Sequence, residues 1–168
     1  MWGQSRTIGP WLLEVRWVGG GEELYREFKL RFGDEVCAKD HLGFTDAKLE
    51  ERDKRHASMG DTRYVLEPNI KEGKGGLRDL QTLFWIAKFI YKVDDVSQLV
   101  DQDVLTAADA KLFAKAQNFL WTVRCHLHYL VGRPEERLSF DVQTELTGCM
   151  SYSDRAGMNG DERLRQFY

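Results

Sequence analysis

The chain has 168 residues, 42% of them hydrophobic, and its 24 basic and 27 acidic residues leave a formal net charge of −3. This apolar fraction suffices for a packed core and excludes a generally disordered chain, while the interspersed charges exclude a broad basic surface for nucleic acid. No stretch reaches the roughly 18 to 20 apolar residues of a membrane span, and no signal peptide is recognisable at residues 1–10, which predicts a cytoplasmic protein.

The first part of the chain predicts short elements of different kinds. Residues 11–18 are compatible with a helix or a strand, because so short a mixed run does not settle its own period. Residues 22–32 place large apolar side chains on one helical face, and Gly33 should end that helix. Residues 45–57 are charged helix formers with a thin apolar stripe, which predicts an exposed helix. Residues 61–78 should form a structured loop with a brief extended piece at 64–66.

Two long helices follow, and they define the fold class. Apolar residues at three- and four-residue steps predict a central helix over 77–91 and a longer one over 107–131. Thr106 and Asp109 resemble a capping box at the start of the second helix, and Gly132 is suited to its end. A short turn should run from Asp141 to 146, and a last helix should begin at Asp161. The sequence therefore predicts a mainly α fold, an antiparallel helical bundle with a Gly-rich loop at one end.

Segment 67–80, which reads EPNIKEGKGGLRDL, is the strongest candidate for a binding site. Glycines before a helix let backbone N–H groups approach an anion at the positive end of the helix dipole, and Lys71, Lys74 and Arg78 add charge beside it. The turn could bind phosphate, although it is not a Walker loop, because Gly75 follows the lysine. The alternative is a Gly-Gly helix start in which Arg78 and Asp79 form ordinary ion pairs and caps.

Other polar clusters favour structural interpretations. Cys125, His126 and His128 point in different directions on a helix and should not converge on a metal ion. The three cysteines of the chain lack a C-x-x-C spacing, which predicts reduced thiols. Three arginines near the end of the long helix could line an anion site but more often form a self-paired turn; they are Arg124, Arg133 and Arg137. The aromatic residues are expected to lie in the core and on the half-buried surface of the bundle; they are Phe84, Trp85, Phe89, Phe113, Phe119 and Trp121.

Several long motifs resemble the bacterial bifunctional PII-protein uridylyltransferase/uridylyl-removing enzyme family. They read RHASMGDTRYVLEPNIK at 55–71, GGLRDLQTL at 75–83, NFLWTVRCHLH at 118–128 and RLSFDVQ at 137–143, in the same order as in the family. The resemblance covers about residues 11–148. It implies a nitrogen-regulatory enzyme that uses Mg²⁺ to transfer UMP from UTP to the PII signal protein, and that later removes the group by hydrolysis.

The resemblance also implies how the chain is divided. Residues 1–43 would end a nucleotidyltransferase domain and connector, 44–148 would form the helical domain of the substrate-binding type, and 149–168 would be a truncated or divergent tail. The Asp-x-Asp metal ligands and the His-Asp hydrolase motif of the family are absent, so the resemblance assigns no catalytic residue and no metal ligand here, and we expect the chain alone to be inactive.

The helix start and the resemblance together assign candidate contacts to nucleotide or PII protein. The cations Lys71, Lys74 and Arg78 would make these contacts beside Gly75 and Gly76, and Glu67 and Asp79 would orient them. The alternative is a non-catalytic helical module that binds a protein or a nucleotide.

Overall fold

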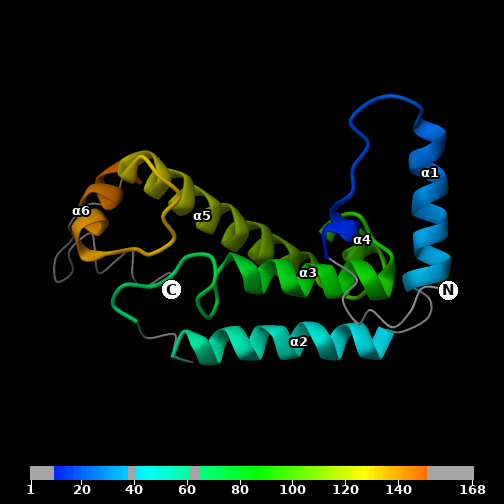
Figure 1. Ribbon diagram of the computed structural model, residues 1–168, viewed down its shortest axis with the longest axis horizontal. Helices are drawn as coiled ribbons and strands as arrows, with labels where there is room; N and C mark the ends of the chain where they lie inside the picture. The colour runs from blue at the N-terminus through cyan, green and yellow to red at the C-terminus, as the bar shows by residue number, and fades with distance from the viewer. Residues whose placement is uncertain (1–9, 38–40, 61–64, 151–168) are drawn as a thin grey trace. The chain divides into compact units, whose positions relative to one another are not determined.

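The computed structural model describes residues 10–37, 41–60 and 65–150, and these are mainly helical (Figure 1). The α-helices are α1 (Glu22–Arg31), α2 (His41–Ser58), α3 (Leu77–Tyr91), α4 (Val96–Asp101), α5 (Ala107–Val131) and α6 (Phe140–Cys149). A short 3-10 helix, η1 (Pro10–Glu14), and a π-helical stretch, η2 (Phe32–Cys37), complete the regular elements. Within the described ranges there is no strand, only an isolated bridge between Asn69 and Arg137. The mainly α prediction is confirmed.

The two principal helices have the predicted bounds. Helix α3 spans 77–91 and α5 spans 107–131. The capping box at the start of α5 is also present, since the Asp109 N–H donates to Thr106 Oγ1 over 3.1 Å and the Thr106 N–H donates to Asp109 Oδ2 over 3.4 Å. At its other end Gly132 has a φ of +70°, a left-handed conformation that glycine adopts without strain.

The predicted ends of the shorter elements were less accurate. The backbone does not stop being helical at Gly33, because α1 continues into η2. Helix α2 begins at His41, and it is not simply exposed, because Phe44, Lys48 and His56 are buried. Residues 65–66 lie in the loop that was predicted, whereas α4 was not predicted. The helix predicted from Asp161 and residues 61–64 lie outside the described residues.

The chain divides into two compact units, and each has its own core. The first comprises residues 1–52 and 82–110. Its buried cluster consists of Leu13, Cys37, Phe44, Trp85 and Phe89. The rings of Phe44 and Phe89 stack with centroids 4.0 Å apart, and the Trp85 indole N–H donates to Glu14 over 2.9 Å. Trp85 and Phe89 of α3 therefore serve as core and Phe84 is half-buried, as the sequence predicted.

The second unit comprises residues 53–81 and 111–168 and contains the candidate binding loop. Its buried cluster consists of Ile70, Leu77, Leu120, Val123, Leu127, Leu138 and Leu146. Two backbone bonds join the loop to the segment before α6: the Ile70 N–H donates to the Glu136 carbonyl over 2.8 Å, and the Leu138 N–H donates to the Pro68 carbonyl over 2.9 Å. The start of the loop is thus fixed both by burial of Ile70 and by this pairing.

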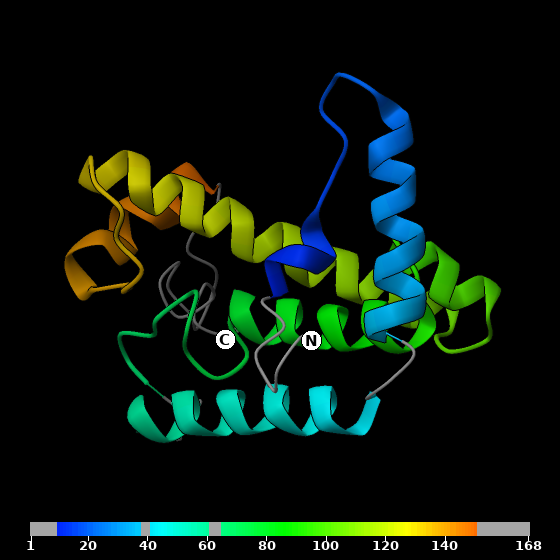
Figure 2. The ribbon, with the colours of Figure 1, turned by 45° about the vertical axis from the view of Figure 1, so that its right-hand side comes forward.

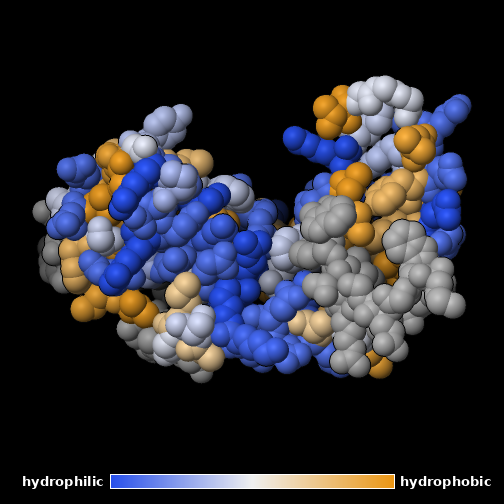
Figure 3. Space-filling view, in the orientation of Figure 1, coloured by the Kyte–Doolittle hydropathy of each residue, from blue (hydrophilic) through white to orange (hydrophobic). Residues whose placement is uncertain are grey.

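Some apolar side chains remain exposed. In the first unit they include Trp17, Val18, Leu24 and Leu30, which belong to α1 and the segment before it (Figure 3). Across the described residues, no helix combines the length and the apolar character that crossing a membrane requires.

The apolar stripe of α5 is only partly buried, which gives a matched test of the packing. Leu127 is 0% exposed and Leu112 is 66% exposed, although both lie on the predicted stripe. We expect Leu127→Ala to lower the free energy of unfolding by about 2–5 kcal/mol, because it leaves a cavity. Leu112→Ala should change it by less than about 0.5 kcal/mol. Urea unfolding of both variants measures the difference, and equal losses would contradict the described core.

The cap of α4 predicts a pH-dependent contribution to stability. The Asp95 side chain accepts the Ser97 N–H over 2.8 Å, and this backbone hydrogen bond lowers the pKa of Asp95. We expect Asp95→Ala to cost about 1 kcal/mol at neutral pH. Because the folded-state pKa is lowered, that contribution is present above the ordinary Asp pKa and is lost as the pH falls through the folded value. Thermal unfolding of both proteins at neutral and strongly acid pH checks this; a difference that persisted in acid would rule it out.

Candidate functional site

The loop before α3 is built from consecutive turns (Figure 2). The Asn69 side-chain oxygen accepts the N–H groups of Lys71 and Glu72 over 3.1 and 2.7 Å, and its carbonyl accepts the Gly73 N–H over 3.0 Å. An asparagine that binds the backbone two and three residues ahead is a common way to fix a turn. Asn69 therefore sets the course of the chain on which Lys71 and Glu72 stand.

Gly76 allows the loop to fold back onto the start of its own helix. A Cβ atom at this position would lie 2.6 Å from the Ile70 carbonyl oxygen and 2.9 Å from that of Gly73, closer than carbon and oxygen tolerate. Gly75 beside it has a φ of +82°, which favours glycine for a different reason. The two glycines are therefore required by geometry, whatever the loop binds.

The N–H groups at the start of α3 already have acceptors within the chain. All four bonds are to backbone carbonyls, at 2.9 to 3.4 Å: Leu77 donates to Ile70, Arg78 donates to Lys71, and both Asp79 and Leu80 donate to Gly76. The Gly75 N–H donates to Asp79 Oδ2 over 2.7 Å. An anion approaching this helix start would therefore meet side chains first, since the backbone donors that usually serve anions are engaged.

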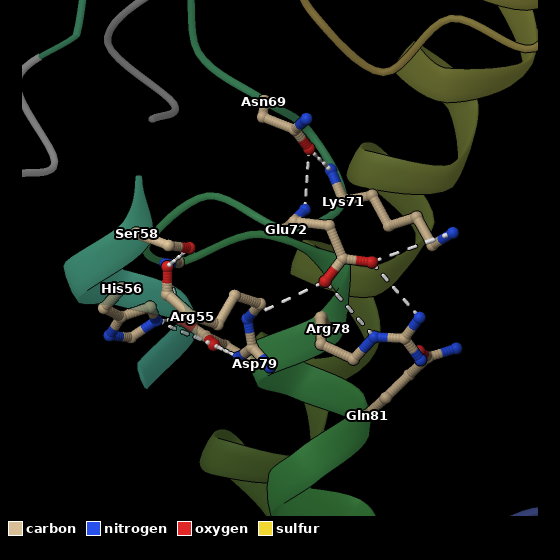
Figure 4. A network of polar contacts seen from close by, with 10 residues as sticks. Arg55, His56, Ser58, Asn69, Lys71, Glu72, Arg78, Asp79 and Gln81 are labelled. Carbon is tan, nitrogen blue, oxygen red and sulfur yellow. Dashed lines mark hydrogen bonds and ion pairs between the residues drawn. The ribbon is translucent and has the colours of Figure 1, made fainter. Parts of the chain in front are cut away.

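Asp79 joins the first turn of α3 to the end of α2 (Figure 4). Its carboxylate accepts from a terminal guanidinium nitrogen of Arg55, lies 2.9 Å from His56 Nε2, and receives the Gly75 N–H. All three side chains are largely buried, with exposed fractions of 16% for Asp79, 15% for Arg55 and 9% for His56. Asp79 therefore orients Arg55 and His56.

Glu72 is the second carboxylate of the cluster, and it faces cations. Arg78 Nη2 donates to Glu72 Oε1 over 3.2 Å and Arg78 Nε donates to Oε2 over 3.5 Å. Lys71 Nζ lies 3.7 Å from Oε1, and Arg55 Nε lies 3.8 Å from Oε2. The structure thus brings two predicted residues, Lys71 and Arg78, to one carboxylate. Lys74 is half-buried in the same loop.

Glu67 has a separate structural role. Its carboxylate accepts a hydrogen bond from Arg137 Nη2 over 2.7 Å and another from the Phe140 N–H over 3.0 Å. Phe140 is the first residue of α6. A carboxylate at a helix start is favourable because it complements the unpaired N–H groups and the dipole there. Glu67 therefore links the loop to α6.

Sequence reasoning missed Arg55, His56 and Glu72 as members of the cluster. The pattern of α2 predicted an exposed helix, and a charged residue on such a helix gives no sign of a distant partner. One signal was available, because Arg55 and His56 begin the first of the family-like motifs and Asp79 lies in the second.

The remaining polar candidates pair among themselves or stay apart. Arg124 forms three contacts of 2.6 to 3.1 Å with Glu136, which raises the pKa of Arg124, and Arg133 pairs with Glu135. Arg124 and Arg133 therefore pair with glutamates of the turn, as the sequence favoured, whereas Arg137 pairs with Glu67 of the loop. Among the described residues no group of three or more His, Cys, Asp or Glu side chains could hold a metal, and the cysteines at 37, 125 and 149 are free thiols.

Comparison with known proteins places this chain in a family. The family described as GlnD PII-uridylyltransferase matches residues 43–168, which is most of the chain and includes the entire cluster. The chain belongs to the GlnD PII-uridylyltransferase family. This confirms the resemblance that the motifs indicated.

The individual relatives are much longer than this chain. Each is described as a bifunctional uridylyltransferase/uridylyl-removing enzyme: that of Azospirillum brasilense is 56% identical, that of Rhodospirillum rubrum 54% and that of Novosphingobium aromaticivorans 49%. Each match covers 96% of this chain but only 17 or 18% of the relative. No solved structure matches.

The two glycines at 76 and 148 provide a matched test of the loop geometry. Gly76→Ala places a methyl group against the Ile70 carbonyl, and we expect a loss of about 1–3 kcal/mol in the free energy of unfolding, as for other overpacked sites. Gly148 lies inside α6 with nothing within 4 Å of an added Cβ, so Gly148→Ala should stabilise by about 0.5–1 kcal/mol. Chemical denaturation measures the change in the free energy of unfolding for both variants. If Gly76→Ala left that free energy unchanged, the close approach would not be required.

Proposed function

We propose that this chain is the helical part of a bifunctional enzyme that transfers UMP from UTP to the PII signal protein and removes it by hydrolysis. The observation that carries the proposal is the 49–56% identity to enzymes with that printed name over nearly the whole chain. Because the chain spans only about a sixth of those relatives, the proposal assigns it a supporting role beside catalytic groups that other parts of a longer polypeptide supply.

Within that function, the cations of the loop contact the UTP triphosphate. Lys71 and Arg78 converge at the first turn of a 15-residue helix, and Lys74 lies between them in sequence. Positive side chains beside a helix N-terminus favour phosphate through both their own charge and the helix dipole. Gly75 and Gly76 contribute by shaping the turn. Asp79 and Glu67 contribute by holding Arg55, His56 and the start of α6 in place.

Magnesium does not fit the residues described here. Mg²⁺ prefers several oxygen ligands in a near-octahedral arrangement, and in the described ranges no group of three or more acidic, His or Cys side chains is placed to hold a metal ion. Both carboxylates of the loop cluster are engaged with cations. Under the proposal, a metal needed for the transfer is held elsewhere in the longer enzyme, and that enzyme acts in the cytoplasm. The proposal also keeps the predicted division of this chain: residues 1–43 end the nucleotidyltransferase domain and connector, 44–148 form the helical domain, and 149–168 form the tail.

Charge removal in an active full-length enzyme carrying this segment tests the assignment. We expect Lys71→Ala and Arg78→Ala each to raise the KM for UTP about 10- to 100-fold, the loss typical of one charge-assisted hydrogen bond. The matched control is Lys115→Ala, which removes the same charge from an exposed position of α5 and should leave the KM unchanged.

The measurement is steady-state kinetics with UTP and PII protein varied separately, accompanied by thermal unfolding. A rise in the KM for PII protein alone would assign the same cations to the protein substrate. Unchanged kinetics in both loop variants, with both proteins folded, would remove the assignment. Labelling of PII protein by the isolated chain with UTP and Mg²⁺ would contradict the supporting role.

A further inference from the structure

Glu72 lies where three cations from different parts of the second unit converge. Arg55 comes from the end of α2, Lys71 from the loop and Arg78 from the first turn of α3. Their nearest nitrogens lie 3.8, 3.7 and 3.2 Å from the Glu72 oxygens (Figure 4). Only the Arg78 contacts are within hydrogen-bond distance, and the other two are looser ion pairs. The Glu72 carboxylate therefore lies near three cations but forms hydrogen bonds with only one of them, Arg78.

Arg55 has a donor that Glu72 does not satisfy. Its Nε atom is buried and has no hydrogen-bond partner, although a terminal nitrogen of the same guanidinium is bound to Asp79. A buried N–H without an acceptor is costly, and most such groups in proteins are paired. Asp79 holds the guanidinium so that this Nε lies on the Glu72 side, which leaves a fixed, unused donor next to the other two cations.

A phosphate group matches this arrangement better than a carboxylate does. It offers three acceptor oxygens and up to two negative charges, whereas Glu72 offers two oxygens and one charge. Arginine forks and lysine ammonium groups are the side chains that most often bind phosphate. Glu72 can make room, because 27% of its side chain is exposed while its backbone N–H stays anchored by Asn69.

We propose that Arg55, Lys71 and Arg78 form one phosphate-binding site, and that the Glu72 carboxylate occupies it until a polyphosphate ligand displaces it. The inference rests on the proposed function and adds to it two residues, Arg55 as a ligand-binding donor and Glu72 as an internal competitor. A ligand can bind only to the fraction of molecules in which Glu72 has left the site. Glu72 therefore lowers the apparent affinity of the site for phosphate and favours ligands of high charge.

Glu72→Gln tests the competition, because it keeps the shape of the side chain and removes its charge. We expect it to lower the Kd for tripolyphosphate and for UTP about five- to tenfold in calorimetric titrations of the intact chain, as follows from opening a site that is otherwise mostly occupied. The matched control is Glu35→Gln, which removes one charge from an exposed ion pair with Arg31 and should leave both constants unchanged. Thermal unfolding shows that each variant is folded.

The wild-type protein provides a second measurement that needs no stable variant. Addition of tripolyphosphate should shift the Arg55 Nε–H resonance in ¹⁵N NMR spectra, because that donor gains an acceptor; Arg55→Lys assigns the signal. A saturating ligand that leaves this resonance in place overturns the inference.

The outcomes separate the inference from the proposed function. If Lys71→Ala weakens UTP binding while Glu72→Gln leaves it unchanged or weaker, Glu72 is a structural partner and the inference is wrong, while the proposed function stands. Tightening for tripolyphosphate but not for UTP supports the phosphate site and counts against UTP as its ligand. If no loop variant changes the binding of either anion, both proposals fall.

Discussion

The close return of the loop onto the first turn of α3 is the constraint on which the rest of the second unit depends. It requires that residue 76 have no side chain, because the Ile70 carbonyl oxygen occupies the space where a Cβ would stand. The same carbonyl accepts the Leu77 N–H, so one backbone group both excludes a side chain and begins the helix. Burial of Ile70 at 0% exposure and its pairing with Glu136 hold the other end of the loop. The backbone of Lys71 and Glu72 is then held between two anchored points.

Under the proposed function, this closure decides which groups contact the anion. A glycine-rich turn before a helix usually presents free N–H groups, but here the first-turn donors are engaged by loop carbonyls and Gly75 by Asp79. An anion would therefore be bound by side chains: Arg55 from α2, Lys71 from the loop and Arg78 from α3. Solvent-exposed ion pairs contribute only about 0–1 kcal/mol, and the side chains of Lys71 and Glu72 are 33% and 27% exposed, so we infer that this pair is the one that a ligand exchanges. The more deeply buried Asp79 is a fixed support, since removing one partner of a buried pair is costly.

The sequence predicted the long helices well because their determinants are local. The bounds of α3 and α5 follow from apolar spacing, a Thr106–Asp109 capping box and a glycine at the end, all of which act within a few residues. Helix α2 was harder to interpret, because Phe44 stacks on Phe89 and His56 contacts Asp79, and both partners are distant in sequence. Similarly, Leu112 and Leu127 have the same pattern on α5 but differ in burial, since the pattern does not specify where neighbouring elements end.

The candidate site was predictable in composition but not in pairing. The sequence indicated Lys71, Lys74 and Arg78 as neighbours of a helix start, which is a local property. Nothing in the sequence indicated that Glu72 of the loop lies beside Arg55 of α2. That contact depends on the course of the loop, which Asn69 and Gly76 determine. The distribution of donors follows a consistent physical logic. Asp79 binds a terminal nitrogen of Arg55, whereas the Nε of the same guanidinium has no hydrogen-bond partner and lies 3.8 Å from Glu72. Within the described ranges no group of acidic side chains is placed to hold a metal. Under the proposed function, such a segment holds charge in place beside a reaction that groups on another part of a longer polypeptide carry out.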